Sequence, residues 1–210
     1  MFIVDFDDTL FDTQRFKQAR LAAVADLGVS EEIFWKSYYQ ARNASDGSFV
    51  YSDERHAQIL SIFGFEENKI LEKLKSVSAK ISNFLFNDSI DFLEFLRSTK
   101  QRLILLSLGD PNFQEYKVKG VGIEKYFDHL FMISSDKKKI IEKIFKFEKA
   151  DEVWFINDKP DETLEISANF KNIKPVLKVS PNRDLSDYTQ SKLPCFYTLT
   201  EIKNYVAQFV

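Results

Sequence analysis

The fold is decided at the start of the chain, where residues 2–10 read FIVDFDDTL. Three apolar residues run directly into an acidic segment, a pattern typical of a buried strand that ends in polar side chains. Strand alternation points Asp5 and Asp7 in related directions as the strand gives way to a turn. The stretch therefore predicts a strand whose carboxyl end carries clustered carboxylates.

After this strand the pattern of the chain changes twice. Residues 12–83 carry apolar side chains at helical spacing and predict several helices without a strand. From residue 84 onward strands and helices alternate, which is typical of a doubly wound parallel sheet. Further strands are expected at 103–107, 130–133, 153–156, 175–179 and 195–198. A last helix is expected to be capped at Thr200-Glu201.

The predicted organisation is an α/β core of residues 1–11 and 84–210 with a helical cap domain, residues 12–83, inserted after the first strand. An insertion there lies over the carboxyl ends of the strands, where open α/β sheets bind ligands. Hinges are expected at 12–15 and 81–87. The cap offers polar and aromatic side chains to a ligand: Arg15, Arg20, Tyr38, Tyr39, Arg42, Asn43, Asp46, Tyr51, Arg55 and His56.

Composition excludes several classes of protein. The 29 Lys and Arg residues against 32 Asp and Glu give a net charge of −3, which argues against nucleic acid as a partner. The single cysteine, Cys195, excludes an internal disulfide, and no Cys/His cluster has the spacing of a zinc site. The first residues lack the pattern of a signal peptide, and no apolar run is long enough to cross a membrane. We expect a soluble cytoplasmic protein, as a monomer or homodimer.

A second acidic cluster follows the strand expected at 153–156, where residues 157–162 read NDKPDE. Two parallel strands that end in acids can share one cation, and oxygen ligands favour a hard ion such as Mg²⁺. Asp161 and Glu162 are also well placed to cap the next helix. That alternative leaves Asp158 unexplained.

Two further features suit a phosphate group. Ser107 ends an apolar strand, and its hydroxyl with the neighbouring amides could hold phosphate oxygens. The run Lys137-Lys138-Lys139 begins a helix, and a cation there could offset the charge of Asp5 and of a phosphoryl group. Taken singly, the serine also fits an ordinary turn and the lysines fit a solvated helix face.

In order and position, these motifs resemble the four motifs of the haloacid dehalogenase superfamily, and residues 12–83 resemble its helical C1-type cap. The resemblance implies that Asp5 is the nucleophile and also binds Mg²⁺. It implies that Asp7 protonates the leaving group, then activates water, and binds Mg²⁺ through its backbone carbonyl. Thr9 would help to fix the loop.

The same resemblance assigns the remaining positions. Ser107 would bind the phosphoryl group, and a lysine of the run would hold nucleophile and phosphate together. The apolar pair Ile140-Ile141 favours Lys137 for this role, with Lys138 the near alternative. Asp158 would complete the metal ligands, and Asp161 or Glu162 would orient them. The second motif reads Ser-Leu-Gly where many relatives have Thr-Asn-Gly, and Asn157 stands where Gly is common.

These assignments predict a Mg²⁺-dependent phosphatase that acts on a small phosphorylated metabolite through an aspartyl-phosphate. Asp7 favours a phosphatase over a dehalogenase of this superfamily, because an alkoxide leaving group needs a proton and a halide does not. A phosphomutase that uses the same aspartate is an alternative. A relative that binds phosphate or protein without catalysis is another.

Overall fold

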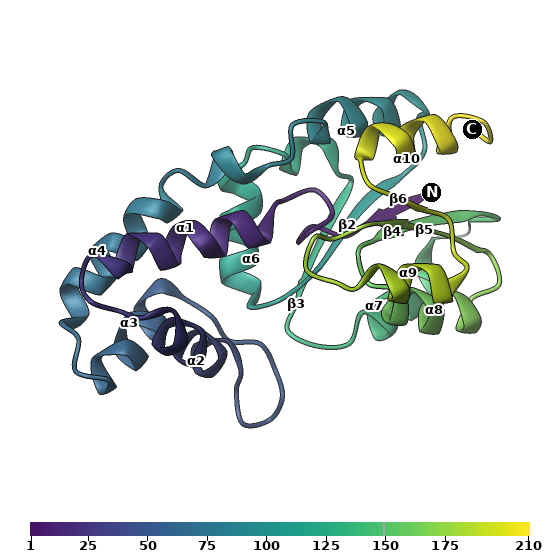
Figure 1. The fold of residues 1–210 in the computed structure, drawn as a ribbon. Helices are drawn as coiled ribbons and strands as arrows, with labels where there is room; N and C mark the ends of the chain where they lie inside the picture. The colour runs from purple at the N-terminus through teal and green to yellow at the C-terminus, as the bar shows by residue number, and fades with distance from the viewer. Residues whose placement is uncertain (149) are drawn as a thin grey trace.

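The computed structural model describes residues 1–148 and 150–210. Its centre is a six-stranded sheet, parallel throughout, in the order β3-β2-β1-β4-β5-β6 (Figure 1). The strands are β1 (Phe2–Val4), β2 (Leu103–Leu108), β3 (His129–Ile133), β4 (Val153–Asn157), β5 (Ile173–Lys178) and β6 (Cys195–Phe196). This topology confirms the predicted doubly wound α/β fold.

Strand β1 lies in the middle of the sheet and is buried on both faces. Alternate residues pack into different layers: Phe2 and Val4 join one apolar cluster and Ile3 joins another. The register places Val4 opposite Leu105 of β2 and Ile156 of β4. The carboxyl ends of these three strands therefore meet, and polar residues that follow them gather at one edge of the sheet.

Helices cover both faces of the sheet (Figure 1). One face is packed by α5 (Ser89–Ser98), α6 (Pro111–Gly120) and α10 (Leu199–Val206), and the other by α7 (Lys137–Phe147) and α8 (Pro160–Asn169). Single 3₁₀ turns lie at Ile81–Phe84 and Glu124–Tyr126. No helix among the described residues is both long and apolar enough to cross a membrane.

Two details of the carboxyl-terminal third differ from the expectation. Helix α10 is capped by Thr198 in a capping box with Glu201, so the predicted cap at Thr200 is wrong. Thr200 instead donates hydrogen bonds from its amide and hydroxyl to Asp88. The short helix α9 (Leu185–Ser191) was not expected, because its sequence lacks a clear helical repeat of apolar residues.

The segment between β1 and α5 forms four helices beside the sheet (Figure 1): α1 (Thr13–Ala25), α2 (Glu31–Arg42), α3 (Asp53–Ile62) and α4 (Glu67–Ser78). We call residues 13–78 the helical module. Its helices pack around an apolar cluster of their own, which includes Val24, Phe34, Leu60 and Leu74. A separate core allows such a module to keep its shape if it moves relative to the sheet.

The module joins the sheet through two chain segments that lie side by side. Phe11 forms an antiparallel bridge with Leu85, and the amide of Asp12 donates to the carbonyl of Phe84 at 2.7 Å. A second contact lies elsewhere, where the amide of Phe49 donates to the carbonyl of Ser134 at 3.1 Å. Asp12, Phe84 and Leu85 lie within the residues predicted as hinges, whereas Phe11 lies one residue before them. The second contact links the module to the loop after β3.

Candidate active site

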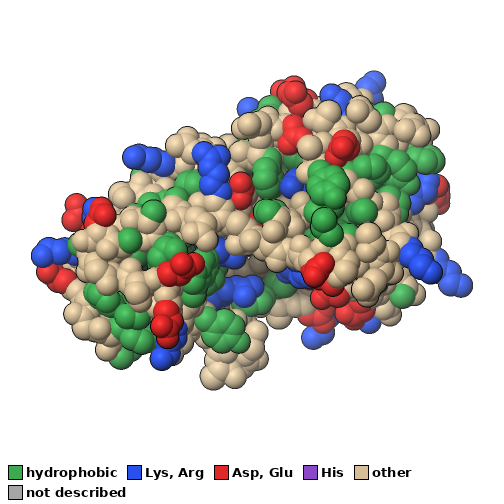
Figure 2. Space-filling model, viewed as in Figure 1, with side chains coloured by type: hydrophobic (Ala, Val, Ile, Leu, Met, Phe, Trp, Pro, Cys, Tyr) green, Lys and Arg blue, Asp and Glu red, His purple; other side chains and the backbone are tan. Residues whose placement is uncertain are grey.

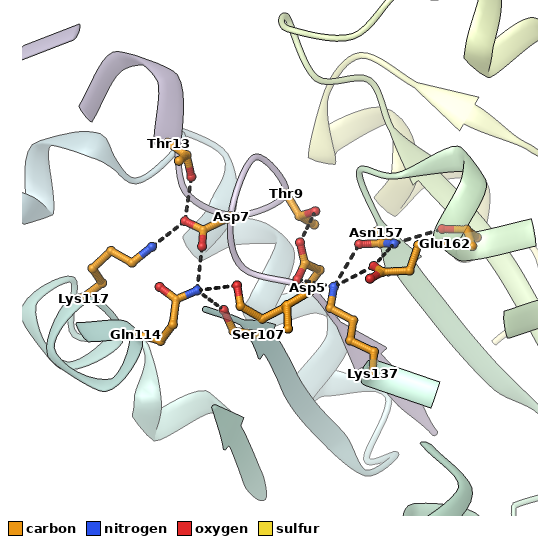
Figure 3. Close-up of polar contacts among 12 residues, drawn as sticks. Asp5, Asp7, Thr9, Thr13, Ser107, Gln114, Lys117, Lys137, Asn157 and Glu162 are labelled. Carbon is orange, nitrogen blue, oxygen red and sulfur yellow. Dashed lines mark hydrogen bonds and ion pairs between the residues drawn. The ribbon is translucent and has the colours of Figure 1, made fainter. Parts of the chain in front are cut away.

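The polar residues of the first and fourth motifs meet at the carboxyl edge of the sheet (Figure 3). Asp5 follows β1, and its amide donates to the carbonyl of Ile156 in β4 at 2.9 Å. Asp158 follows β4, and both carboxylates are almost fully buried, at 3% and 4% exposure. Ser107, near the end of β2, is completely buried on the other side of β1.

Lys137, the first residue of α7, makes the central ion pair of this edge. Its Nζ donates to Asp5 Oδ1 at 2.6 Å and lies 3.0 Å from Glu162 Oε2. A third contact, at 3.3 Å, goes to Asn157 Oδ1. Burial by itself would lower the pKa of Lys137, but Asp5 and Glu162 outweigh it and raise the pKa above its usual range. The ammonium therefore stays charged beside the carboxylate.

The structure separates the alternatives that the sequence left open. Lys138 points toward Glu165, at 3.8 Å, and Lys139 toward Asp136, at 3.7 Å, so of the run only Lys137 contacts Asp5. Of the two acids in α8, Glu162 contacts Lys137. Asp161 is 77% exposed and pairs with Arg183.

Thr9 lies in the tight turn that follows β1. Its hydroxyl donates to Asp5 Oδ2 over a long 3.4 Å, and the amides of Leu10 and Phe11 donate to the carbonyl of Phe6 at 2.9 and 3.0 Å. Asp8 adopts a left-handed φ of 59°, a conformation that Asp tolerates better than most residues. These bonds hold the turn, and with it Asp5 and Asp7, in one arrangement.

Asp7 is held by three side chains that the sequence did not single out (Figure 3). Its Oδ1 accepts hydrogen bonds from Lys117 at 2.5 Å and Thr13 at 2.6 Å, and its Oδ2 accepts one from Gln114 at 2.6 Å. Burial would raise the pKa of Asp7. Lys117 and the hydrogen bonds outweigh that effect and hold the pKa well below its usual range.

Gln114 also ties the second motif to the first. Its amide nitrogen donates to Ser107 Oγ at 2.6 Å as well as to Asp7. Gly109 leaves room for this side chain, since a Cβ at that position would lie 2.9 Å from the Gln114 amide. The Ser-Leu-Gly sequence thus has a physical reason here, because the glycine allows close packing of a buried amide.

Two buried carboxylate oxygens at this edge lack a hydrogen-bond partner among the described residues, Asp158 Oδ1 and Asp8 Oδ1. Burial first, and then the nearby charge of Asp5, raise the pKa of Asp158 to about 8. Facing carboxylates with free oxygens fit a hard divalent cation. In the described part of the chain no three acidic, His or Cys side chains cluster as a metal site, so a cation would need backbone or solvent oxygens as well.

A cavity of about 490 Å³ lies over these residues, between the sheet and the helical module. Asp5, Asp7 and Asp158 line it from the sheet side, and side chains of α1 and α2 line it from the module. Figure 2 shows the corresponding hollow between the two parts of the molecule, with basic side chains in it. The volume is typical of a site for a small metabolite.

Comparison with known proteins identifies the family. The family model of the haloacid dehalogenase-like hydrolases matches residues 1–165 of the sequence, which include Asp5, Ser107, Lys137 and Asp158. The chain belongs to this family. No curated protein matches the sequence.

Solved structures of haloacid dehalogenase-like proteins share the fold of this hydrolase at low identity. A protein from Burkholderia xenovorans assigned to the same family superposes with a TM-score of 0.74 at 14% identity, over 99% of this chain and 96% of that one. A protein from Thermotoga maritima, assigned as a β-phosphoglucomutase, superposes with a TM-score of 0.68 at 18% identity, over 100% of this chain and 99% of that one. The L-2-haloacid dehalogenase of Xanthobacter autotrophicus gives 0.64 at 16%, over 100% and 98%. These similarities show the fold and leave the reaction open.

In this haloacid dehalogenase-like hydrolase, the residues that sequence reasoning missed come mainly from α6. Gln114 and Lys117 lie three positions apart and are buried, at 2% and 4% exposure. Polar residues at that spacing can share one helix face. The sequence does show two polar side chains on the helix face that also carries the apolar Val118, shortly after Ser107. Only the fold shows that this face meets Asp7.

Proposed function

We propose that the protein is a Mg²⁺-dependent phosphatase that hydrolyses a small phosphate monoester through an aspartyl-phosphate on Asp5. The observation that carries the proposal is Asp7, a second carboxylate two residues after the nucleophile, which lines the same cavity. An ester oxygen needs a proton as it leaves, and we assign the supply of that proton to Asp7. A halide leaves without one, so carbon–halogen chemistry gives no reason for this residue.

In the first step an oxygen of Asp5 attacks phosphorus and the bond from phosphorus to the ester oxygen breaks. Asp7 gives its proton to the departing oxygen. The negative phosphoryl group opposes the effect of Lys117 on Asp7, since a nearby like charge raises a carboxyl pKa and favours the protonated form. Lys137, in contact with Asp5, neutralises charge on the nucleophile and on the transferring group.

In the second step water attacks the phosphorus of the aspartyl-phosphate and Asp7 takes up its proton. The bond between phosphorus and the Asp5 oxygen breaks, which frees phosphate and restores the carboxylate. Ser107 supplies a hydroxyl near the phosphoryl position, and Gln114 orients that hydroxyl at 2.6 Å.

The unpartnered oxygen of Asp158 and the carboxylate of Asp5 would hold Mg²⁺, together with the backbone carbonyl of Asp7. When bound, the ion supplies charge neutralisation for the phosphoryl oxygens. Glu162 would keep Lys137 and Asn157 in place, since it contacts both side chains.

The test is phosphate release from p-nitrophenyl phosphate with Mg²⁺ and with EDTA, in the wild type and in Asp5→Asn. We expect metal-dependent turnover that the substitution abolishes without unfolding the protein. Asp151→Asn is the matched control, an exposed aspartate before β4 at the opposite end of the strand from the site. Full activity of Asp5→Asn would exclude the aspartyl-phosphate. Chloride release from 2-chloropropanoate, with no phosphate release from any ester, would favour a dehalogenase.

A further inference from the structure

The module side of the cavity presents three polar side chains that the proposed chemistry does not use. Lys17 comes from α1, and Tyr38 and Arg42 come from α2, one helical turn apart. All three line the cavity that Asp5, Asp7 and Asp158 line from the sheet. They therefore face the place where the leaving group of a phosphate ester would lie.

None of the three makes an ion pair or a side-chain hydrogen bond with the part of the chain that the structure describes. Lys17 Nζ lies 5.5 Å from the centre of the Tyr38 ring, and the Arg42 guanidinium stacks on Phe49 at 4.2 Å. Such stacking leaves the edge of a guanidinium free to donate hydrogen bonds.

The neighbouring Arg20 shows what a structural cation looks like in the same module. It is 1% exposed, and it donates to Tyr51, Asp53 and Ser78. Its charge is matched by the carboxylate of Asp53 at 2.5 Å. Within residues 1–148 and 150–210, Lys17 and Arg42 have no such carboxylate in contact, although both line a cavity large enough for a ligand.

Two of the carboxylates that line the sheet side of the cavity already have another lysine in contact. Asp5 has Lys137 and Asp7 has Lys117, each at ion-pair distance. Burial lowers the pKa of Lys17, the charges of Asp8 and Asp7 oppose that effect, and Arg42 and Lys159 add to it. The ammonium of Lys17 thus lies near carboxylates and near other cations, but it makes no ion pair with any of them in the described part of the chain.

We propose that Lys17, Tyr38 and Arg42 bind a second anionic group on the substrate, a carboxylate or a phosphate carried by the leaving group. Arg42 offers a planar pair of donors that matches either anion, Lys17 offers a compact charge, and Tyr38 offers a hydroxyl. This inference rests on the proposed function for the phosphate ester itself. It narrows the substrate to a small metabolite that is anionic at both ends, within about 490 Å³.

The test measures binding with phosphonates, which cannot be hydrolysed and so report independently of turnover. Isothermal titration with Mg²⁺ present compares three ligands of similar length: 3-phosphonopropanoate, propane-1,3-bisphosphonate and propylphosphonate. Their distal groups are a carboxylate, a phosphonate and a methyl group. 3-Aminopropylphosphonate, which carries a distal ammonium, is the control ligand of opposite charge. The first two ligands distinguish a carboxylate subsite from a phosphate subsite.

We expect the wild type to bind at least one distal anion about tenfold to a hundredfold more tightly than propylphosphonate, and the ammonium ligand more weakly. In Arg42→Gln and Lys17→Met the ratio of the affinity for the anionic ligand to the affinity for propylphosphonate should fall toward one. Tyr38→Phe should lower this ratio less. Lys36→Met is the matched control, an exposed lysine of α2 that lies over Phe63 and not in the cavity. It should keep the wild-type ratio.

Equal affinity of the wild type for the anionic and methyl ligands would overturn the proposal. An unchanged ratio in both Arg42→Gln and Lys17→Met, with thermal unfolding showing that they are folded, would do the same. A protein that prefers the distal anion but releases phosphate from no ester would contradict the proposed phosphatase and leave the anion subsite standing.

Discussion

His56 gives the helical module a defined sensitivity to acid. The ring is fully buried, with Nε2 3.0 Å from Ser37 Oγ and Nδ1 3.0 Å from Tyr51 Oη. The Ser37 hydroxyl donates to the carbonyl of Phe34, so Nε2 has to be the donor to Ser37. The Tyr51 oxygen accepts from Arg20, which leaves its own hydrogen for Nδ1. The network therefore fits the neutral ring, in which Nε2 carries the hydrogen and Nδ1 accepts one.

The size of the effect follows from proton linkage. Burial first, and then the charge of Arg20, lower the pKa of His56 from 6.5 to about 3. Between these values the unfolded chain binds one proton more than the folded chain, so the free energy of unfolding falls as the pH falls, by about 1.4 kcal/mol per pH unit. From pH 7.5 to pH 5 the loss from His56 alone is about 2 kcal/mol.

The assay is urea unfolding of the wild type and His56→Gln at pH 7.5, 6.5, 5.5 and 5.0. Trp35 of α2 reports on the module when Trp154 of β4 is replaced by Phe in both proteins. This variant should be less stable at pH 7.5, because Gln does not reproduce the buried ring and its two hydrogen bonds. It should lose less stability toward pH 5, because Gln cannot titrate. The stability difference between the two proteins should shrink by about 2 kcal/mol.

Carboxylates that titrate in the same range contribute to both proteins and cancel in the difference. Parallel curves for wild type and His56→Gln would refute the argument, since they would mean that the folded chain protonates His56 as readily as the unfolded chain.

Three further predictions concern Asp7 and its partners. Lys117→Met should lower the free energy of unfolding at pH 7 by about 2–3 kcal/mol, because it leaves the half-buried carboxylate of Asp7 without its counter-charge. Lys119→Met, at an exposed position of the same helix, should change it by less than about 0.5 kcal/mol, and equal effects in urea titrations would argue against the ion pair. Asp7→Asn should lose more activity toward an alkyl phosphate than toward p-nitrophenyl phosphate, whose leaving group needs less protonation, and equal losses in kcat would deny Asp7 the role of acid. Gly109→Ala should displace the Gln114 amide and lower kcat by about tenfold with the fold retained, which circular dichroism and steady-state kinetics would check.

The sequence by itself predicted the sheet because its signals are local. A strand buried on both faces is continuously apolar, and β1, β2 and β4 each read that way up to a polar residue at or next to the end of the strand. The parallel arrangement followed from alternation with helices, and the position of Asp5, Ser107 and Asp158 at strand ends followed from that arrangement. The missed helix α9 and the shifted cap at Thr198 are short features, for which a few residues carry little periodicity.

Choices between neighbouring residues were decided only by the tertiary structure. Whether Lys137 or Lys138 meets Asp5 depends on the angle at which α7 begins, and one residue turns a helical side chain by about 100°. The same holds for Asp161 and Glu162 in α8. A sequence places such residues in the right segment, whereas the direction of each side chain is fixed by packing between segments.

The residues around Asp7 and on the module side of the cavity show this limit most clearly. The sequence determined that carboxylates cluster at the end of β1, because apolar and acidic residues adjoin there in one short stretch. Only the folded chain shows that Lys117, 110 residues away, neutralises one of them. The same is true of Lys17 and Arg42, which line the same cavity without a carboxylate in contact among the residues that the structure describes. Such pairings join elements distant in the chain, and no local pattern encodes a contact that is made when separate layers pack.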